Sequence, residues 1–538
     1  MPNELVRQLL WPAKKLPGYL NAYRQFLDLR EKVRPYRWRR TSLRQWLSEL
    51  DQVSGQTVLK NPRRVLFFCV LPWWVNISLA TAVALAGCGC VVDLVWLPYS
   101  NFGPRGASFW EKYSLWVGRS FHGVVHRRLC LRNLSNMKPS ELTEAQEEEV
   151  KKQARVDTQY VGRKEEINIE SNPSDREIYR FRLARDRNCM AALVSLLGEQ
   201  RYDAMIVANG AILEMGIAYR LAKLEHLPCI TFEYFDKRGF AGVSDEGPCT
   251  ELNTDDAWQA DEPHVLTEGR IRRVMQLIAA KEGGNWEEFT LRLHHMPRST
   301  AADLIDGLNL KPDRPIALMC PNVAWDSSTM GRNKAFASMA EWVRITVDYF
   351  ARHPSGQLVV RAHPAERALG TSQPVDEIIR EHCKELPDNI RLILPEDVVN
   401  TYSLMDIADL GLVYTSTAGM EMAARGLPVI VSADTHYCNR GFTVDPTTVE
   451  SYYVALNEAI MNPSKQKLTD RQIELAYCYI DVFYDQWPKP FPWNLETLKQ
   501  DIVEWPISRI LSKEGLEKFG ATFDSLAGRK DKYPGDQL

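Results

Sequence analysis

The sequence predicts an α/β protein built from two Rossmann-like domains whose parallel sheets face each other, with a basic helical extension at the N-terminus. The length of 538 residues suggests two or three domains. Hydrophobic residues make up 45% and charged residues 25%, which is typical of a globular chain with a large core. Short apolar runs alternate with helical patterns in two successive stretches, and this alternation favours parallel sheets with helical crossovers.

The N-terminal extension is expected at residues 1–58. Its first 45 residues hold eleven Lys or Arg and three acidic residues, with aromatic side chains between them. Such a stretch could form a basic amphipathic helix that contacts anionic lipid. It could also be a solvated helical extension packed on the main body, and we favour this second interpretation.

The first α/β stretch covers residues 59–307. Residues 65–92 contain no charged side chain, and Asp93 is the first charged residue after them. The segment is long enough to cross a bilayer. Their pattern is strand, breaker, helix and strand, which favours a buried parallel sheet instead. A charged stretch near 138–187 is expected to form a helical insertion with solvated faces and no chemistry. The other expected elements are strands at 202–210 and 228–235 and a helix at 214–227.

The second α/β stretch follows a linker at 308–314 and covers residues 308–480. Its expected strands lie at 315–320, 357–364, 389–394, 410–414 and 427–434, and its expected helices at 334–354, 403–409 and 417–426. Residues 481–538 are expected to form a helical return and a tail.

Charge and cysteine content exclude some classes of protein. The net charge of −3 argues against a nucleic-acid partner. The eleven cysteines include no C-x-x-C pair, which favours reduced thiols in a cytosolic protein. No secretory signal opens the chain. We therefore expect a cytoplasmic location, with peripheral contact at the inner face of the membrane left open.

Polar residues gather where the predicted strands end. Ligands of open α/β sheets bind beyond the carboxyl ends of the strands, so segments 321–327, 361–366 and 415–421 should meet at one edge. The candidate binding residues there are Asn322, Asp326, Arg361, His363, Pro364, Thr415, Ser416, Thr417, Gly419 and Glu421. In the first stretch, the corresponding strand end carries Asn209 and Gly210.

Segment 415–421 places hydroxyl residues and a glycine at a helix start directly after an apolar strand. Free backbone N–H groups and the helix dipole favour an anion at such a place, so the segment suits a phosphate. An ordinary N-cap is the alternative. Glu421 lies one helical turn further on, where it could accept hydrogen bonds from a ribose or serve as a capping-box acid.

His363 follows a strand and precedes a proline. The proline favours an extended backbone at the histidine, which would direct the imidazole outward. An imidazole there could donate to a phosphate or to a leaving nucleotide. A lone histidine is usually structural, but together with Arg361 and segment 415–421 it is predicted to contact the ligand.

Five motifs occur in order between residues 315 and 446, namely PNVAWDSS, F-x-S-M-x-E-W, VVRAHPAE, VYTSTAGMEMAARGLPVIV and HYCNRGFTVDP. Together they resemble the capsule polysaccharide biosynthesis glycosyltransferases, GT-B enzymes related to the Kdo transferases of capsule assembly. The resemblance implies a GT-B-like fold and a nucleotide-sugar donor, CMP-activated in that group, bound through His363-Pro364 and Ser416-Thr417. It also implies a glycan or lipid-linked acceptor on the side of the first domain.

The same motifs leave the donor class open, because teichoic-acid-type polymerases share similar ones. A glycerophosphotransferase or a nucleotide-sugar epimerase on the same fold are therefore alternatives. A non-catalytic docking subunit of a capsule assembly machine is another.

The resemblance also implies a carboxylate base after a strand of the first domain. Kdo transferases carry an Asp in an E-D-G-like segment, and here the matching place, 232–236, lacks the Asp-Gly. Glu233 is the first candidate and Asp236 the second. Asp245-Glu246-Gly247 is similar to the acidic-Gly motif of sialyl- and polysialyltransferases but is expected to be a turn. A carboxylate suits the role because the acceptor hydroxyl must lose a proton.

No Asp-x-Asp occurs in the sequence, although glycosyltransferases that hold a nucleotide diphosphate through a metal usually have one. The adjacent Asp255 and Asp256 are interpreted as a solvated loop. We expect no metal site and no cofactor, with a helix terminus and the His and Arg side chains stabilising the departing phosphate.

Overall fold

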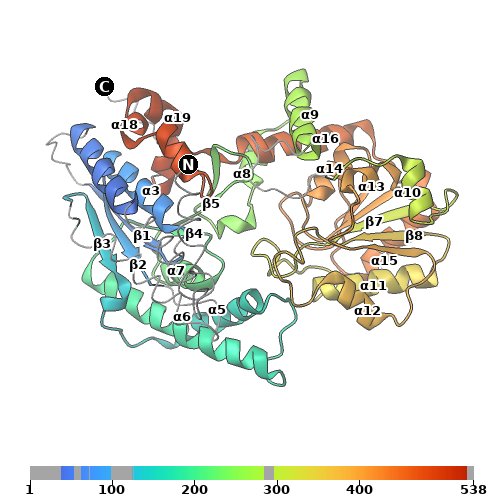
Figure 1. Ribbon diagram of the computed structural model, residues 1–538, viewed down its shortest axis with the longest axis horizontal. Coiled ribbons are helices and arrows are strands. Elements are labelled where there is room, and N and C mark those ends of the chain that lie inside the picture. The colour runs from blue at the N-terminus through green and yellow to red at the C-terminus, as the bar shows by residue number, and fades with distance from the viewer. Residues whose placement is uncertain are drawn as a thin grey trace, which may run out of the picture.

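The computed structural model describes residues 38–53, 62–71, 73–98, 124, 126–283 and 296–529. Its two sheets lie in separate lobes, each covered by helices (Figure 1). The predicted α/β, GT-B-like architecture with two Rossmann-like halves is therefore confirmed. We call the part built on the first sheet the N-terminal lobe and the part built on the second sheet the C-terminal lobe.

The N-terminal lobe has a seven-stranded sheet in the order β12-β6-β5-β4-β1-β2-β3. Its strands are β1 (Arg63–Cys69), β2 (Cys90–Trp96), β3 (Leu129–Asn133), β4 (Ala204–Ala208), β5 (Cys229–Tyr234), β6 (Phe240–Ser244) and β12 (Lys489–Pro490). The strands from β5 to β3 run parallel, whereas β6 and β12 form an antiparallel edge. The sequence did not indicate this edge. It arises because only five residues separate β5 from β6, too few for a helical crossover.

The charge-free segment forms β1, helix α3 (Val75–Gly87) and β2, as predicted. Helix α3 is buried almost all round, because it lies between the sheet and the C-terminal helices. A Cβ atom on Gly87 would meet the Leu511 side chain at 2.4 Å. Burial of α3 on both sides explains why this segment carries no charged side chain. Among the described residues, no helix is both long and apolar enough to cross a membrane.

The charged stretch near 138–187 forms two helices, as predicted, and the second of them continues to residue 199, close to the start of β4. Helices α5 (Glu144–Gly162) and α6 (Pro173–Glu199) pack on each other and on α7 (Leu213–Leu224). Their charged faces are not all solvated, since Arg182 and Asp186 are fully buried between the helices. The expectation of solvated faces is wrong at these positions because Arg182 pairs with Asp157 across the helix interface and with Asp186 within α6.

The C-terminal lobe has a fully parallel five-stranded sheet in the order β11-β10-β7-β8-β9. Its strands are β7 (Ile316–Cys320), β8 (Gln357–Arg361), β9 (Ile390–Ile393), β10 (Leu410–Val413) and β11 (Val429–Val431). The helices around them are α11 (Met339–Arg352), α12 (Val375–His382), α13 (Thr401–Ile407), α14 (Ala418–Ala424) and α15 (Val449–Met461). Every strand and helix predicted for this lobe is present, most with shorter ends, whereas α13 lies two residues earlier than predicted.

The chain exchanges segments between the lobes. Helices α8 (Asp255–Ala260), α9 (Glu268–Gly283) and α10 (Ala301–Gly307) share a hydrophobic core with the second sheet, although the sequence assigned them to the first half. In return, the chain leaves the C-terminal lobe through α16 (Asp470–Asp481) and the π-helix η5 (Val482–Gln486). It then adds β12, α17 (Leu498–Glu504), α18 (Ile507–Ile510) and α19 (Lys513–Leu526) to the N-terminal lobe, where α18 and α19 lie beside α3 (Figure 1).

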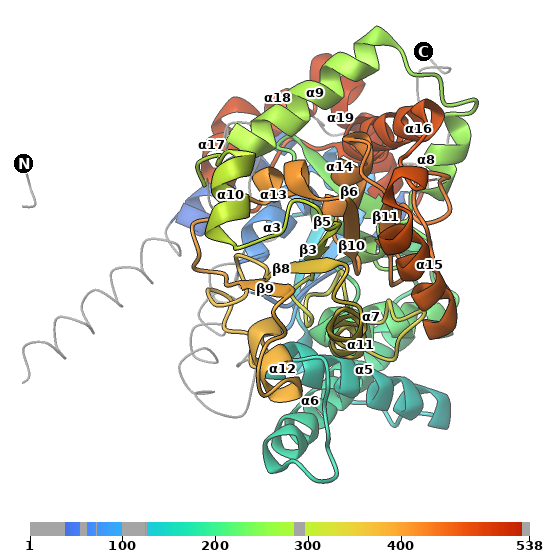
Figure 2. The ribbon, with the colours of Figure 1, turned by 90° about the vertical axis from the view of Figure 1, so that its right-hand side faces the viewer.

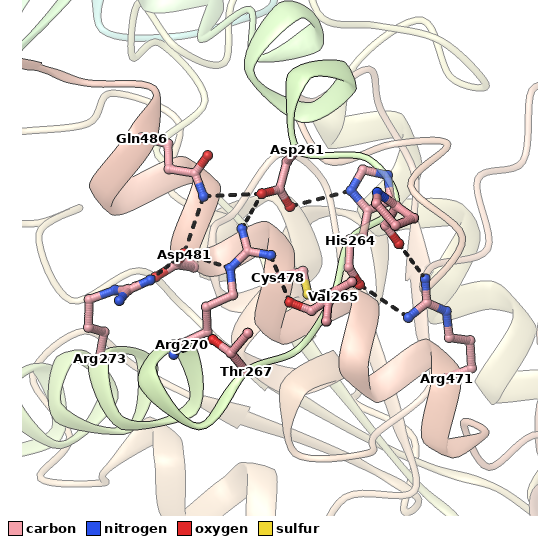
Figure 3. A network of polar contacts seen from close by, with 11 residues as sticks. Asp261, His264, Val265, Thr267, Arg270, Arg273, Arg471, Cys478, Asp481 and Gln486 are labelled. Atoms are coloured by element: carbon pink, nitrogen blue, oxygen red, sulfur yellow. Dashed lines mark hydrogen bonds and ion pairs between the residues drawn. The ribbon is translucent and has the colours of Figure 1, made fainter.

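A polar network fastens α9 to α16, where the chain leaves the C-terminal lobe (Figure 3). The Asp481 carboxylate is buried and accepts hydrogen bonds from Arg270 Nε at 2.9 Å and Arg273 Nε at 2.7 Å. Burial alone would raise the pKa of Asp481, but these two guanidinium groups outweigh that effect and lower it. Arg270 also pairs with Asp261, which extends the network to the end of α8.

Residues 38–53 form a helix that packs Leu43, Trp46 and Leu50 into the core of the N-terminal lobe. This part of the N-terminal extension is therefore a structural element, as the favoured interpretation expects. The remainder of the basic stretch, residues 1–37, lies outside the described residues.

Candidate functional site

Asn209 joins the two lobes at the carboxyl ends of their strands. Its side-chain Nδ2 donates to Glu233 Oε2 at 3.1 Å and to Ser327 Oγ, in the other lobe, at 3.4 Å. Asn209 and Gly210 both have left-handed backbones, with φ of 61° and 85°. A Cβ atom on Gly210 would lie 2.6 Å from the Thr231 side chain, so only glycine fits there. The turn after β4 thus directs an amide at the candidate base.

The candidate base Glu233 is the last residue but one of β5 and is half-buried. Burial raises its pKa to about 7, and the nearby Asp326 carboxylate acts in the same direction. Hydrogen bonds from the Asn209 side chain and the Tyr234 N–H oppose the rise. A carboxyl with a pKa near neutrality is suited to take a proton from a hydroxyl.

The second candidate, Asp236, lies close to the same group of charges. Burial raises the pKa of Asp236, Lys281 opposes the rise and Asp326 adds to it. Asp326 itself is fixed by its own loop, because Ser328 donates to Asp326 Oδ1 from its N–H at 2.9 Å and from its Oγ at 2.6 Å. The charge of Asp326 in the C-terminal lobe therefore acts on both candidate bases of the N-terminal lobe.

His363 follows β8 in the C-terminal lobe, and its imidazole is held in one tautomer. Nδ1 accepts the Ala365 N–H at 3.2 Å, so in the neutral ring the proton is on Nε2. Burial lowers the pKa of His363, and this outweighs the opposing effect of Asp326. His363 therefore offers a neutral N–H donor on the lobe that also carries Asp326.

Segment 415–421 is fixed by neighbouring strand ends. The Thr415 N–H donates to Asn322 Oδ1 at 3.0 Å, and Tyr437 donates from its hydroxyl to the Ser416 carbonyl at 2.5 Å. A Cβ atom on Gly419 would lie 2.5 Å from that tyrosine oxygen, which accounts for the glycine. Thr417 makes no side-chain cap, while Ser416 Oγ accepts the Ala418 N–H at 3.3 Å.

Two predicted binding residues already have protein partners. Arg361 is buried and donates to the Leu394 carbonyl, and burial lowers its pKa. Glu421 is buried and pairs with Lys281, which also donates to the Tyr484 hydroxyl at 2.9 Å. Pro364, next to His363, is half-buried. Contact of Arg361 or Glu421 with a ligand stays a prediction, and for Glu421 it would involve the oxygen not bound to Lys281.

Other acidic residues are separate from this site. Asp245 and Glu246 are exposed in a bend after β6, which agrees with the turn interpretation. Asp255 and Asp256 do not form a loop, because they begin helix α8, where Asp255 pairs with Arg440. That interpretation is wrong because their carboxylates favour the first turn of a helix. In the described ranges, no cluster of three His, Cys, Asp or Glu side chains could hold a metal ion.

Sequence reasoning missed two residues near the carboxylates, Tyr160 and Lys281. Burial raises the pKa of Tyr160 to about 12, and the charges of Asp326 and Glu233 add to the rise. The Tyr160 ring packs edge to face against Trp325 of the C-terminal lobe. Tyr160 belongs to the charged stretch to which no chemistry was assigned. Only the tertiary packing of α5 and α9 brings these two side chains to the strand ends.

Residues 284–474 match the model of a family described as "Capsule polysaccharide biosynthesis protein". This region contains the whole second sheet and segments 321–327, 361–366 and 415–421. Over this region the chain is similar to that family, and the resemblance noted in the sequence is confirmed there. No curated protein matches the chain.

Similar solved structures include KpsC of Thermosulfurimonas dismutans, a beta Kdo 2,4 transferase, with 13% identity and a TM-score of 0.34, covering 57% of this chain and 87% of KpsC. UDP-GlcNAc 2-epimerase of Neisseria meningitidis has 11% identity and a TM-score of 0.28, covering 82% and 100% of the two chains. Sucrose-phosphate synthase of Thermosynechococcus elongatus has 14% identity and a TM-score of 0.29, covering 82% and 98%.

Proposed function

We propose that this chain is a glycosyltransferase of bacterial surface or capsular polysaccharide biosynthesis. It moves a sugar from a nucleotide-sugar donor, CMP-activated in the family that it resembles, to a glycan or lipid-linked acceptor. The donor binds to the C-terminal lobe, the acceptor approaches from the N-terminal lobe, and no metal or other cofactor takes part.

One observation carries the proposal. Asn209 hydrogen-bonds both Glu233, a carboxyl group with a pKa of about 7, and Ser327 in the loop after β7. That loop belongs to the region that matches the capsule biosynthesis family. The proposed proton acceptor, Glu233, is thus linked through the Asn209 side chain to the lobe that we expect to hold the donor.

The chemistry assigns each group a single task. Glu233 takes the proton of the acceptor hydroxyl as its oxygen forms a bond to the anomeric carbon of the donor sugar. The bond between that carbon and the donor phosphate oxygen breaks, and the phosphate leaves with the electron pair. His363 donates its Nε2–H to the phosphate as the negative charge develops.

The direct test is a turnover assay with CMP-, UDP- and GDP-sugars and with CDP-glycerol, each with and without acceptor glycans and each repeated in EDTA. We expect a nucleotide-sugar to be consumed only when an acceptor is present, at a rate that EDTA does not change. Conversion of a nucleotide-sugar to an isomer would indicate an epimerase, and turnover of CDP-glycerol a glycerophosphotransferase. Absence of any nucleotide binding would indicate a docking subunit.

Replacing His363 by alanine should weaken nucleotide binding. Loss of one charge-assisted hydrogen bond to a phosphate costs about 1–3 kcal/mol, which is roughly 5- to 150-fold in the dissociation constant. Titration calorimetry with the nucleotide identified by the assay measures the change. His382→Ala, a change at the partly exposed histidine of α12, should leave the affinity unchanged. Equal affinity of folded His363→Ala and wild-type protein would remove His363 from the donor site.

We further propose a cytoplasmic protein with peripheral contact at the inner face of the membrane, made by residues 1–37. These residues carry eight basic and three acidic side chains. Deleting them should reduce co-sedimentation with vesicles of anionic phospholipid, most clearly at low salt, because salt screens exposed charges. The deletion must end before residue 38, because the following helix contributes to the core. If the full-length protein ignores anionic vesicles at low salt, this proposal is wrong.

A further inference from the structure

The turn that follows helix α5 reaches from the N-terminal lobe to the C-terminal lobe. The ends of α5 and α6 lie beside α11 and α12 in both ribbon views (Figures 1 and 2). Three residues of this turn and one from the last turn of α5 make the contacts. We call these four residues the clasp: Tyr160, Arg163, Glu165 and Glu166. They lie in the charged stretch for which the proposed reaction has no use.

Glu165 caps a helix of the opposite lobe. Its carboxylate accepts the Met339 N–H at 2.8 and 2.9 Å and the Ala340 N–H at 3.3 Å, at the first turn of α11. A carboxylate at this end of a helix also interacts favourably with the helix dipole. Burial raises the pKa of Glu165 to about 7, so this contact carries a desolvation cost that the backbone hydrogen bonds oppose.

Glu166 forms a bidentate ion pair with Arg344 of helix α11. Arg344 Nη1 lies 3.0 Å from Glu166 Oε1, and Arg344 Nη2 lies 2.9 Å from Glu166 Oε2. Ser338 donates from its Oγ to Glu166 Oε1 at 3.1 Å. Parallel bonds of this kind fix orientation as well as distance.

Arg163 and Tyr160 lead from these contacts to the site. Arg163 Nη1 donates to the Leu369 carbonyl at 2.6 Å, and its guanidinium lies 5.7 Å from the ring of Trp325. The ring of Tyr160 meets the same tryptophan edge to face at 5.6 Å. Trp325 immediately precedes Asp326 and Ser327, and Ser327 is linked to Glu233 of the other lobe through the Asn209 side chain.

We propose that the clasp is a positioning element for the proposed transfer: it sets the distance between the Asp326 loop of the donor lobe and Glu233 of the acceptor lobe. The inference rests on the proposed function. The clasp contacts the donor lobe on α11, on the loop after β8 and at Trp325. Contacts at three places restrain rotation as well as separation of the lobes, and reacting groups misplaced by about 1 Å can lose 100-fold in rate.

Charge reversal tests the clasp without removing a side chain from the site. In Glu166→Arg and in Arg344→Glu, like charges meet where a pair existed, so the lobes should separate. We expect the maximal transfer rate to fall about 10- to 100-fold. Affinity for the nucleotide should stay within about twofold, because its proposed contacts belong to one lobe. The double variant Glu166→Arg/Arg344→Glu restores an opposite-charge pair and should recover most of the rate. Arg380→Glu, on the neighbouring α12, is the matched control and should act like the wild type.

Hydrogen exchange gives a readout that does not require turnover. The amides of residues 326–330 and 339–340 should exchange faster in each single reversal and return to wild-type rates in the double variant. If the transfer assay finds no turnover at all, the proposed function fails, and the exchange rates still decide whether the clasp holds the lobes. Single reversals that change neither rate nor exchange would overturn the clasp, as would a folded double variant that stays as slow as the single ones.

Discussion

Glu233→Gln should bind the donor as the wild type does and lose most of its transfer activity. The amide keeps the shape of the carboxyl group, but it cannot take the proton of the acceptor hydroxyl. Loss of a general base typically lowers the rate by about 100- to 10,000-fold. Initial rates at saturating donor and acceptor measure this effect, and calorimetry with the nucleotide shows that the donor site is intact.

The pH dependence of the wild-type enzyme belongs to the same prediction. A base acts in its ionised form, and burial raises the pKa of Glu233 to about 7. The rate should therefore fall below about pH 7 and level off above it. In Glu233→Gln, the remaining activity should lose this dependence.

Two further variants make the assignment of the base decisive. Asp236→Asn removes the second candidate, which shares the environment of Glu233. Asp245→Asn removes an exposed carboxyl group in the bend after β6 and should leave transfer unchanged. An inactive Asp245→Asn beside an active Glu233→Gln would contradict our assignment, and it would favour the motif of the sialyltransferases.

The sequence predicted the central elements of both sheets because these elements are determined locally. Strands β7 and β10 are apolar runs of buried residues, and β8 has an apolar centre between Gln357 and Arg361. Each of the three strands is followed along the chain by a helix. A strand buried on both faces needs such a run, and its pattern can be recognised without knowledge of its neighbours. The parallel order of these strands then follows from the helical crossovers between them.

The elements that escaped prediction depend on distant parts of the chain. β12 has only two residues, Lys489 and Pro490, and is a strand only because it meets β6 from the other end of the sequence. Helix α9 shows an ordinary amphipathic pattern, and nothing in it indicates which lobe its apolar face will cover. No local feature of the sequence shows that β12 will pair with β6 or that α9 will pack in the C-terminal lobe.

Part of the candidate site also follows from local sequence and topology, and part depends on residues that are remote in sequence. Strand ends converge by topology, so Glu233, Asp326 and His363 could be placed near one another from the sequence. The partners of Arg361 and Glu421 come from Leu394 and Lys281, which are remote in sequence, so their engagement could not be predicted. Tyr160 was missed because its surroundings in the sequence are highly charged and typical of a solvated helix.

The same charged stretch supplies most of the residues of a buried ion cluster. Arg182 on α6 is fully buried and lies within 3.3 Å of three buried carboxylates, namely those of Asp157, Asp186 and Glu214. Arg185 also pairs with Glu214, so two cations serve three acids. Burial raises the pKa of Asp157 and raises that of Asp186 still further, while Arg182 opposes both shifts.

Arg182→Met should therefore lower the free energy of unfolding by about 3–5 kcal/mol, because it leaves buried carboxylates without their cation. Urea denaturation monitored by tryptophan fluorescence measures the loss. Arg187 lies on α6, as Arg182 does, and forms an exposed ion pair with Glu147 of α5. Arg187→Met removes this pair and should cost less than about 1 kcal/mol.

Carboxyl groups whose pKa is higher in the folded than in the unfolded chain bind extra protons on folding, so acid favours the folded state. The loss in Arg182→Met should accordingly be larger at pH 8 than at pH 5.5. A loss no greater than that of Arg187→Met, or one that grows as the pH falls, would show that the cluster does not depend on Arg182 for its charge balance.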